Sequence, residues 1–85
     1  MEIDLYGKAE KDFEYWKKSG NRAIQKKIQQ LFTDMKEHPF TGVGKPEALK
    51  HSLSGKWSRR ITEEHRIIYD VTGNIINVYS LKGHY

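Results

Sequence analysis

The apolar residues of this chain repeat with a helical period in its first half and with a strand period near its end. Over residues 24–35 the apolar positions recur at i, i+4, i+7, i+8 and i+11, which stacks them on one face of a helix. The residues on that face are Ile24, Ile28, Leu31, Phe32 and Met35. We expect Asn21 to cap the start of this helix, and Pro39 to end it near residues 36–38 because the residue before a proline avoids helical geometry.

Two shorter elements are predicted before this helix. Apolar and polar residues alternate from Ile3 to Tyr6, which is typical of a strand, and Gly7 ends the alternation. Ala9, Phe13 and Trp16 then follow at i, i+4 and i+7, the spacing of a second helical face. A Ser-Gly-Asn break at residues 19–21 separates the two helices.

The end of the chain is rich in β-branched and aromatic residues, which favour strands. We predict strands over 57–62, 66–71 and 75–81, with a turn at 72–74, and one short strand over 48–51. The order is β-α-α followed by an antiparallel meander. The predicted fold class is therefore α+β, a single domain over 1–85 in which two helices pack on one face of a small twisted sheet and leave the other face free.

The small size of the chain limits the kind of site it can build. A domain of 85 residues with 36% hydrophobic residues has a thin core, so we expect a shallow groove instead of a deep pocket. The chain has no cysteine, which excludes disulfides, thiol catalysis and cysteine-based metal sites. No apolar run has the length of a membrane span, and the first residues lack a leader pattern. We therefore expect a soluble cytoplasmic protein.

Positive charge is concentrated in the connection between the second helix and the meander. The formal net charge is only +4, but residues 43–60 contain five basic side chains and a single acidic one, Glu47. The connection over 39–56 is also long for a compact domain, and connections of this length are usually functional or disordered. The pattern predicts a surface that binds an anion.

Two common kinds of site do not fit the residues. The segment Gly42 to Pro46 contains GxGK but lacks the spacing of a phosphate-binding loop, and Pro46 stands where the hydroxyl residue should be. The four histidines show no close pair and have no cysteine companions, as a zinc site would require. We expect neither a metal nor a cofactor.

The residues suit the binding and cleavage of RNA without a metal. Basic and aromatic residues alternate along the predicted sheet, where arginine can grip phosphate and aromatic rings can stack on bases. The candidate rings are Trp57, Tyr69, Tyr79 and Tyr85. Cleavage needs a base for the ribose 2′-OH, positive charge at the phosphate and an acid for the leaving 5′-oxygen. Glu47, the arginines and His84 could supply them, although the residues alone do not select one arginine.

Three segments and the end of the chain carry a resemblance to a known family. The segments are GKPEALKHSLSG at 44–55, WSRRI at 57–61 and EEHRIIY at 63–69, and the chain ends in His84-Tyr85. Together they closely resemble the YoeB/Txe family of bacterial toxins, which belongs to the RelE-like superfamily. The likeness spans essentially the whole chain. Ala48 stands where many relatives have proline, and Gly83 stands where an aromatic residue is often found.

The resemblance implies a RelE-like fold and a ribosome-dependent endoribonuclease that cuts messenger RNA in the decoding site. It makes Glu47 the candidate base, Arg66 the phosphate clamp, His84 the candidate acid and Tyr85 a residue that positions the substrate. The predicted RNA-binding residues are Lys45, Lys50, His51, Lys56, Arg59 and Arg60. The implied partners are a YefM-type antitoxin, the 70S ribosome and mRNA, with a homodimer possible and no membrane.

Two other functions fit parts of the sequence. A basic protein that binds RNA or the ribosome and blocks translation without cutting would have the same charge pattern. A DNA-binding regulator or antitoxin is disfavoured because the two predicted helices lie before the basic stretch and do not form a plausible helix-turn-helix. Mapping of new 5′ ends on translated mRNA distinguishes a cutting enzyme from a blocking protein.

Overall fold

The computed structural model describes residues 1–83, and these form a five-stranded sheet with two α-helices. The elements in chain order are β1 (Glu2–Leu5), α1 (Lys8–Ser19), α2 (Arg22–Glu37), β2 (Glu47–Ala48), the 3-10 turn η1 (His51–Leu53), β3 (Trp57–Arg60), β4 (Arg66–Thr72) and β5 (Ile75–Ser80). Neither helix has the length and apolar character needed to cross a membrane.

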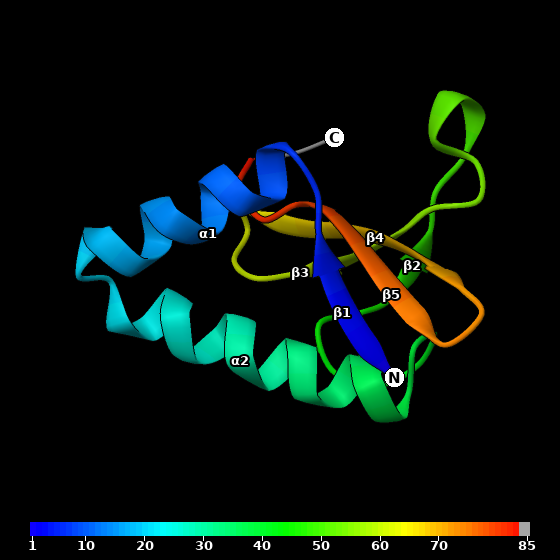
Figure 1. Ribbon diagram of the computed structural model, residues 1–85, viewed down its shortest axis with the longest axis horizontal. Coiled ribbons are helices and arrows are strands. Elements are labelled where there is room, and N and C mark those ends of the chain that lie inside the picture. Colours follow the sequence, from blue (N-terminus) through cyan, green and yellow to red (C-terminus); the bar gives the residue numbers. More distant parts are fainter. Residues whose placement is uncertain (84–85) are drawn as a thin grey trace.

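The sheet has the strand order β1-β5-β4-β3-β2, and both helices lie on one side of it (Figure 1). Strands β2 to β5 pair antiparallel in sequence order, which confirms the predicted meander. Strand β1 pairs parallel with β5, with Ile3 opposite Ile76, so the first and last strands of the chain are neighbours. The α+β class, with two helices on one face and the other face free, is confirmed.

The break between the helices has the predicted geometry. Asn21 accepts a hydrogen bond through its side-chain oxygen from the Ile24 amide at 3.1 Å, and Gly20 takes the left-handed conformation that ends α1. Helix α2 ends at Glu37, within the predicted interval before Pro39. Local sequence signals therefore set both ends of the helical hairpin.

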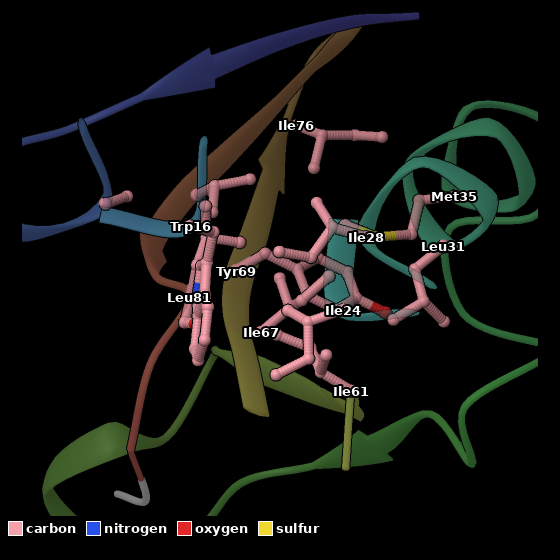
Figure 2. Packing of buried hydrophobic residues seen from close by; sticks show 12 residues of the cluster. Trp16, Ile24, Ile28, Leu31, Met35, Ile61, Ile67, Tyr69, Ile76 and Leu81 are labelled. Atoms are coloured by element: carbon pink, nitrogen blue, oxygen red, sulfur yellow. The ribbon is translucent and has the colours of Figure 1, made fainter. Parts of the chain in front are cut away.

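One hydrophobic core lies between the helices and the inner face of the sheet. Figure 2 shows Ile28, Leu31 and Met35 of α2 facing Tyr69 and Ile76 from the central strands. Four of the five predicted core positions of α2 are buried, whereas Phe32 at the edge of that face is only half-buried. The thin core expected from the chain length is thus a single layer of side chains.

The long connection over 39–56 contains less strand than the sequence predicts. Strand β2 covers only two residues, and residues 51–53 form the turn η1 where the prediction placed the end of a strand. The turn projects beyond the edge of the sheet (Figure 1). Left-handed backbone at His51, with φ of 59°, is incompatible with an extended strand at that residue.

Candidate nucleic-acid interface

Strands β3 and β4 place two of the predicted site residues directly opposite each other. Arg60 and Arg66 are cross-strand partners, so their side chains lie on the same face of the sheet. The neighbouring residues Ile67 and Tyr69 are fully buried in the core, and by alternation the two arginines face away from it. Arg60 is exposed and Arg66 is half-buried. Two arginine residues are therefore neighbours on the outer face, which the helices leave uncovered.

The Arg66 side chain is oriented by backbone carbonyls of the β3–β4 loop. Its Nη1 donates to the carbonyl oxygens of Thr62 at 2.7 Å and Glu63 at 2.9 Å. Within residues 1–83, no carboxylate lies within 4.0 Å of the guanidinium of Arg66 or of Arg60. The charge of this pair is thus not neutralised by an ion pair in the described chain, as the binding of an external anion requires.

Glu47 shares the outer face with the two arginines. It pairs with Ser58 across β2 and β3, and it is exposed. Two strand spacings and two residues separate Glu47 from Arg66, which corresponds to about 12 Å between their Cα atoms on a regular sheet. A separation of this size leaves room for a phosphodiester group on the face between the two residues.

The segment around Glu47 is bounded by two backbone positions of unusual geometry. Lys45 and His51, with φ of 51° and 59°, are the non-glycine residues of the described chain that have positive φ. Such conformations are uncommon outside glycine and often occur at functional sites. They turn the chain sharply on both sides of β2, and leave Lys45, Lys50 and His51 exposed around Glu47.

The basic segment is fixed against the body of the protein at Gly44. The Arg60 amide donates to the Gly44 carbonyl at 2.7 Å, which ties the connection to β3. Gly44 has a φ of 82°, and a Cβ atom at this residue would lie 2.7 Å from Leu31 Cδ2 and 3.2 Å from the Arg60 carbonyl oxygen. Only glycine fits between α2 and β3 at this point, so the start of the basic segment has a defined place.

Arg59 does not belong to the exposed basic surface, and the prediction that it binds RNA is wrong. Its side chain is fully buried, because it lies on the inner face of β3. Its Nη1 forms an ion pair with Asp34 Oδ2 at 2.6 Å, and its Nε donates to the Tyr69 hydroxyl at 3.2 Å. The remaining acceptors are the backbone carbonyls of His38, Thr41 and Val43.

Arg59 instead organises the connection that leads to the site. Its hydrogen bonds hold three backbone carbonyls between residues 38 and 43, while Asp34 also accepts from the Val43 amide at 3.1 Å. The hydrogen bond from Arg59 lowers the pKa of the Asp34 carboxyl below its usual range, and the Val43 bond acts in the same direction. The pair therefore stays ionised at neutral pH.

The aromatic rings that were predicted to stack on bases differ in their burial. Tyr69 is fully buried and its hydroxyl donates to the Pro39 carbonyl at 2.7 Å, so the prediction that it stacks on bases is wrong. Trp57 is half-buried and lies against Phe40, with ring centroids 4.8 Å apart. Tyr79 lies near Tyr6, and its hydroxyl bonds to Asp70. Burial raises the pKa of Tyr79, and the bond to Asp70 raises it further.

Lys56 lies at the end of the basic segment and contacts Tyr79. Its Nζ is 4.9 Å from the centre of the Tyr79 ring, a cation–π contact that keeps the lysine on the outer face. Lys56 is half-buried, and no carboxylate of the described chain lies within 4.0 Å of its ammonium group. Lys56 thus extends the positive surface from the arginine pair toward the middle of the sheet.

The last described residue, Gly83, is attached to the strand that carries Arg66. The Arg66 amide donates to the Gly83 carbonyl at 3.1 Å, and the Gly83 amide donates to His65 Nδ1 at 2.9 Å. The predicted catalytic residues His84 and Tyr85 lie outside the described residues. The chain therefore reaches residue 83 directly beside the arginine pair.

The acidic and histidine side chains do not form a cluster on this face. Among residues 1–83, no three of the Asp, Glu and His side chains lie close enough together to hold a metal ion. At the end of the outer face formed by β2, β3 and β4, the exposed carboxylate of Glu47 instead lies among basic side chains. This arrangement suits proton transfer beside a bound phosphodiester.

Comparison with known proteins places this geometry in a family. Residues 6–85 match the model of the YoeB-like toxin of bacterial type II toxin–antitoxin systems. The chain is 50% identical to Toxin YoeB of Escherichia coli (strain K12) over 74 residues, which cover 87% of each chain.

Two proteins with solved structures show the same fold over the full chain. A YoeB/ParE toxin from Agrobacterium tumefaciens is 38% identical and superposes with a TM-score of 0.94, with 100% of both chains covered. The Staphylococcus aureus protein, solved as a YoeB–YefM complex and as a YoeB dimer, is 38% and 37% identical with TM-scores of 0.90 and 0.89. In both cases all of this chain and 98% of that chain are covered.

Proposed function

The chain belongs to the family of YoeB-like toxins of bacterial type II toxin–antitoxin systems, and on this basis we propose that it is an endoribonuclease that cleaves messenger RNA in the A site of the ribosome. The observation that carries the proposal is the pairing of Arg60 with Arg66 on the outer face, with Glu47 exposed on the same face. The reaction requires neither a metal nor a cofactor.

The proposed chemistry is an attack of the ribose 2′-oxygen on the adjacent phosphorus. Glu47 accepts the proton of the 2′-OH as the new P–O2′ bond forms. The P–O5′ bond breaks, and His84 donates a proton to the departing 5′-oxygen. The products are a 2′,3′-cyclic phosphate and a 5′-hydroxyl, so atoms and charge balance without a water molecule. General acid–base steps of this kind contribute about 10²–10⁴-fold each.

Arg66 is the proposed clamp on the reacting phosphate. Negative charge builds on the phosphate oxygens as the fifth bond forms, and preorganised cations stabilise that charge most when they need not move. The contacts of Nη1 with the Thr62 and Glu63 carbonyls hold the Arg66 guanidinium in advance. Arg60, its cross-strand partner, supports the same phosphate or its neighbour.

The remaining predicted RNA-binding residues would contact the RNA strand on either side of the cleaved bond. These residues are Lys45, Lys50, His51 and Lys56, and Tyr85 is proposed to position the substrate. A flat sheet face offers few contacts to a single strand. The ribosome, which already holds the mRNA, can supply the positioning that this face lacks.

The proposed partner is an acidic antitoxin of the YefM type. The Staphylococcus aureus relative was solved in complex with YefM, and it was also solved as a dimer. We propose that this chain likewise binds such an antitoxin and forms a homodimer. The unpaired cations of the outer face favour an acidic segment, because opposite charges speed association and fix its register.

The proposal is tested by mapping new 5′ ends on mRNA in programmed 70S ribosomes. The unchanged protein should generate new ends that carry a 5′-hydroxyl. Arg66→Gln should lower the single-turnover cleavage rate about 10²–10³-fold. His84→Ala should lose most of the cleavage activity but should still bind the programmed ribosomes. Lys11→Gln, an exposed cation on α1, is the matched control and should cut normally.

Other outcomes select other functions. Blocked translation without any new 5′ ends would identify a protein that only binds RNA or the ribosome. Full activity of His84→Ala would refute the assignment of the acid, and full activity of Arg66→Gln would refute the clamp.

A further inference from the structure

The segment after β5 is held on two sides by hydrogen bonds to α1 and to residues 65–66. Residues 80–83 run beside the start of α1 and the β3–β4 loop (Figure 1). Both backbone groups of Leu81 bond to α1 side chains, and both backbone groups of Gly83 bond to His65 and Arg66. Terminal segments usually fray unless they are tied down, so four bonds on two residues form an unusually complete attachment.

Helix α1 supplies the first pair of these bonds. Asp12 is 7% exposed, and its Oδ2 accepts from the Leu81 amide at 2.9 Å. Trp16 Nε1 donates to the Leu81 carbonyl at 2.9 Å, and Figure 2 shows the Trp16 ring beside Leu81. Lys8 joins the group, because its Nζ donates to Asp12 at 2.6 Å and to the Lys82 carbonyl at 2.7 Å.

The β3–β4 loop supplies the second pair. His65 Nδ1 accepts a hydrogen bond from the Gly83 amide at 2.9 Å. The Trp16 ring meets the His65 ring edge to face, with centroids 4.9 Å apart. Trp16 therefore links the α1 bonds to the loop bonds, and Asp12, Trp16 and His65 form one group.

The backbone conformation at the end of this attachment needs glycine. Gly83 has a φ of 85°, which side chains with a Cβ rarely adopt. The chain turns at Gly83 while both of its backbone groups remain bonded to His65 and Arg66.

We propose that Asp12, Trp16 and His65 are positioning residues that fix where the catalytic end of the chain begins relative to Arg66. The inference rests on the proposed function, in which His84 donates the proton to the leaving oxygen. Proton transfer needs heavy atoms within about 2.6–3.2 Å, and a misplacement of about 1 Å can cost 10²-fold in rate. If Gly83 were not attached in this way, the next residue, His84, would not be held within hydrogen-bond distance of the leaving oxygen.

Two substitutions at His65 separate positioning from simple packing. His65→Asn puts an amide oxygen close to the place of Nδ1 and keeps the acceptor, but it removes the ring that contacts Trp16. His65→Phe keeps a ring against Trp16 and removes the acceptor. If the hydrogen bond from the Gly83 amide positions the site, His65→Phe should lower the single-turnover cleavage rate on ribosomes about 10- to 100-fold, with unchanged affinity for ribosomes. His65→Asn should then cleave at a rate close to that of the unchanged protein.

The amide hydrogen exchange of Gly83 gives a second readout that does not depend on activity. We expect exchange at Gly83 to accelerate in His65→Phe and to remain slow in His65→Asn. Trp16→Phe, which removes the Nε1 donor to Leu81 together with part of the buried indole ring, should lower the rate in the same direction. This variant keeps the test informative if His65→Phe does not fold.

Several results would overturn the inference. Equal cleavage by the unchanged protein, His65→Phe and Trp16→Phe would show that the attachment does not position the site. Loss of activity in His65→Asn with normal activity in His65→Phe would show that only ring packing counts. If the unchanged protein itself cuts no mRNA on ribosomes, the proposed function fails, whereas normal cutting with insensitive variants refutes the positioning role alone.

Discussion

Arg59 forms a buried ion pair with Asp34, with Nη1 and Oδ2 2.6 Å apart, while the adjacent Arg60 faces the opposite side of the sheet. Two consecutive arginines thus have different roles. The first fixes the connection between α2 and β2 from inside, and the second belongs to the cationic outer face. The position of Glu47 therefore depends on an ion pair that itself has no access to RNA.

Asp34→Asn should destabilise the protein more than the removal of an exposed charge. The substitution leaves the Arg59 guanidinium buried without a counter-charge. We expect the free energy of unfolding to fall by about 2–3 kcal/mol. This is less than for a fully buried ion pair, because the Asp34 side chain is 22% exposed. Urea unfolding measures the change. Lys36→Gln, an exposed residue near the end of α2, should change stability by less than about 0.5 kcal/mol. Equal stability of both variants would contradict the structural role of the pair.

The same pair predicts a defined response to acid. The pKa of Asp34 is lower in the folded protein than its ordinary value of 3.8, so the folded state binds fewer protons. Its contribution to stability is fully present above that value and is lost as the pH falls below it through the folded pKa. The stability difference between the unchanged protein and Asp34→Asn should be constant above about pH 5 and should shrink below about pH 4. A difference that grows on acidification would contradict this assignment.

Gly44→Ala should displace the basic segment. The added methyl group meets Leu31 Cδ2 at 2.7 Å and the Arg60 carbonyl oxygen at 3.2 Å, and the φ of 82° is itself unfavourable for alanine. We expect a loss of stability of about 1–3 kcal/mol, together with chemical-shift changes at Lys45 and Glu47. Gly73→Asn is the matched control, because a Cβ atom at this turn residue would have no other atom within 4 Å. It should change neither the stability nor the chemical shifts of Lys45 and Glu47.

Much of the fold follows from local sequence signals. The cap at Asn21, the proline after α2 and the turn at 72–74 set boundaries that depend on neighbouring residues alone. The parallel pairing of β1 with β5 was not predicted, because it joins Ile3 to Ile76 and no short segment encodes such a contact. The strand expected over 48–51 was partly wrong for a related reason, since left-handed geometry at a non-glycine residue gives no clear sequence signal.

Two features of the site could have been found by stricter use of periodicity. Trp57, Arg59 and Ile61 alternate along one face, so the apolar neighbours of Arg59 already indicate that it points inward. Asp12 lies three residues after Ala9 and four before Trp16, on the apolar face of α1, where a carboxylate needs a buried partner. One partner, the Lys8 ammonium group, lies four residues before Asp12 and follows from helical spacing. The other partner, the Leu81 amide, lies far along the chain and could not be identified from spacing.

Glu47→Gln should reduce catalysis without weakening binding. Glutamine keeps the size of the side chain but cannot accept the 2′-OH proton, so the single-turnover rate should fall about 10²–10⁴-fold while the affinity for ribosomes stays the same. Quench-flow cleavage of ribosome-bound mRNA measures the rate. Glu37→Gln, an exposed carboxylate at the end of α2, should cut at the normal rate. A Glu47→Gln enzyme with full activity would exclude Glu47 as the base.

We propose that a small sheet face with few substrate contacts cleaves RNA because the ribosome presents the strand to it. The most direct measurement compares cleavage of one mRNA, free in solution and bound in the A site of programmed 70S ribosomes, by the same purified protein. We expect rapid cutting with 2′,3′-cyclic phosphate ends on ribosomes and nearly intact mRNA without them. Equal cutting of free and ribosome-bound mRNA, or no cutting of either, would contradict it.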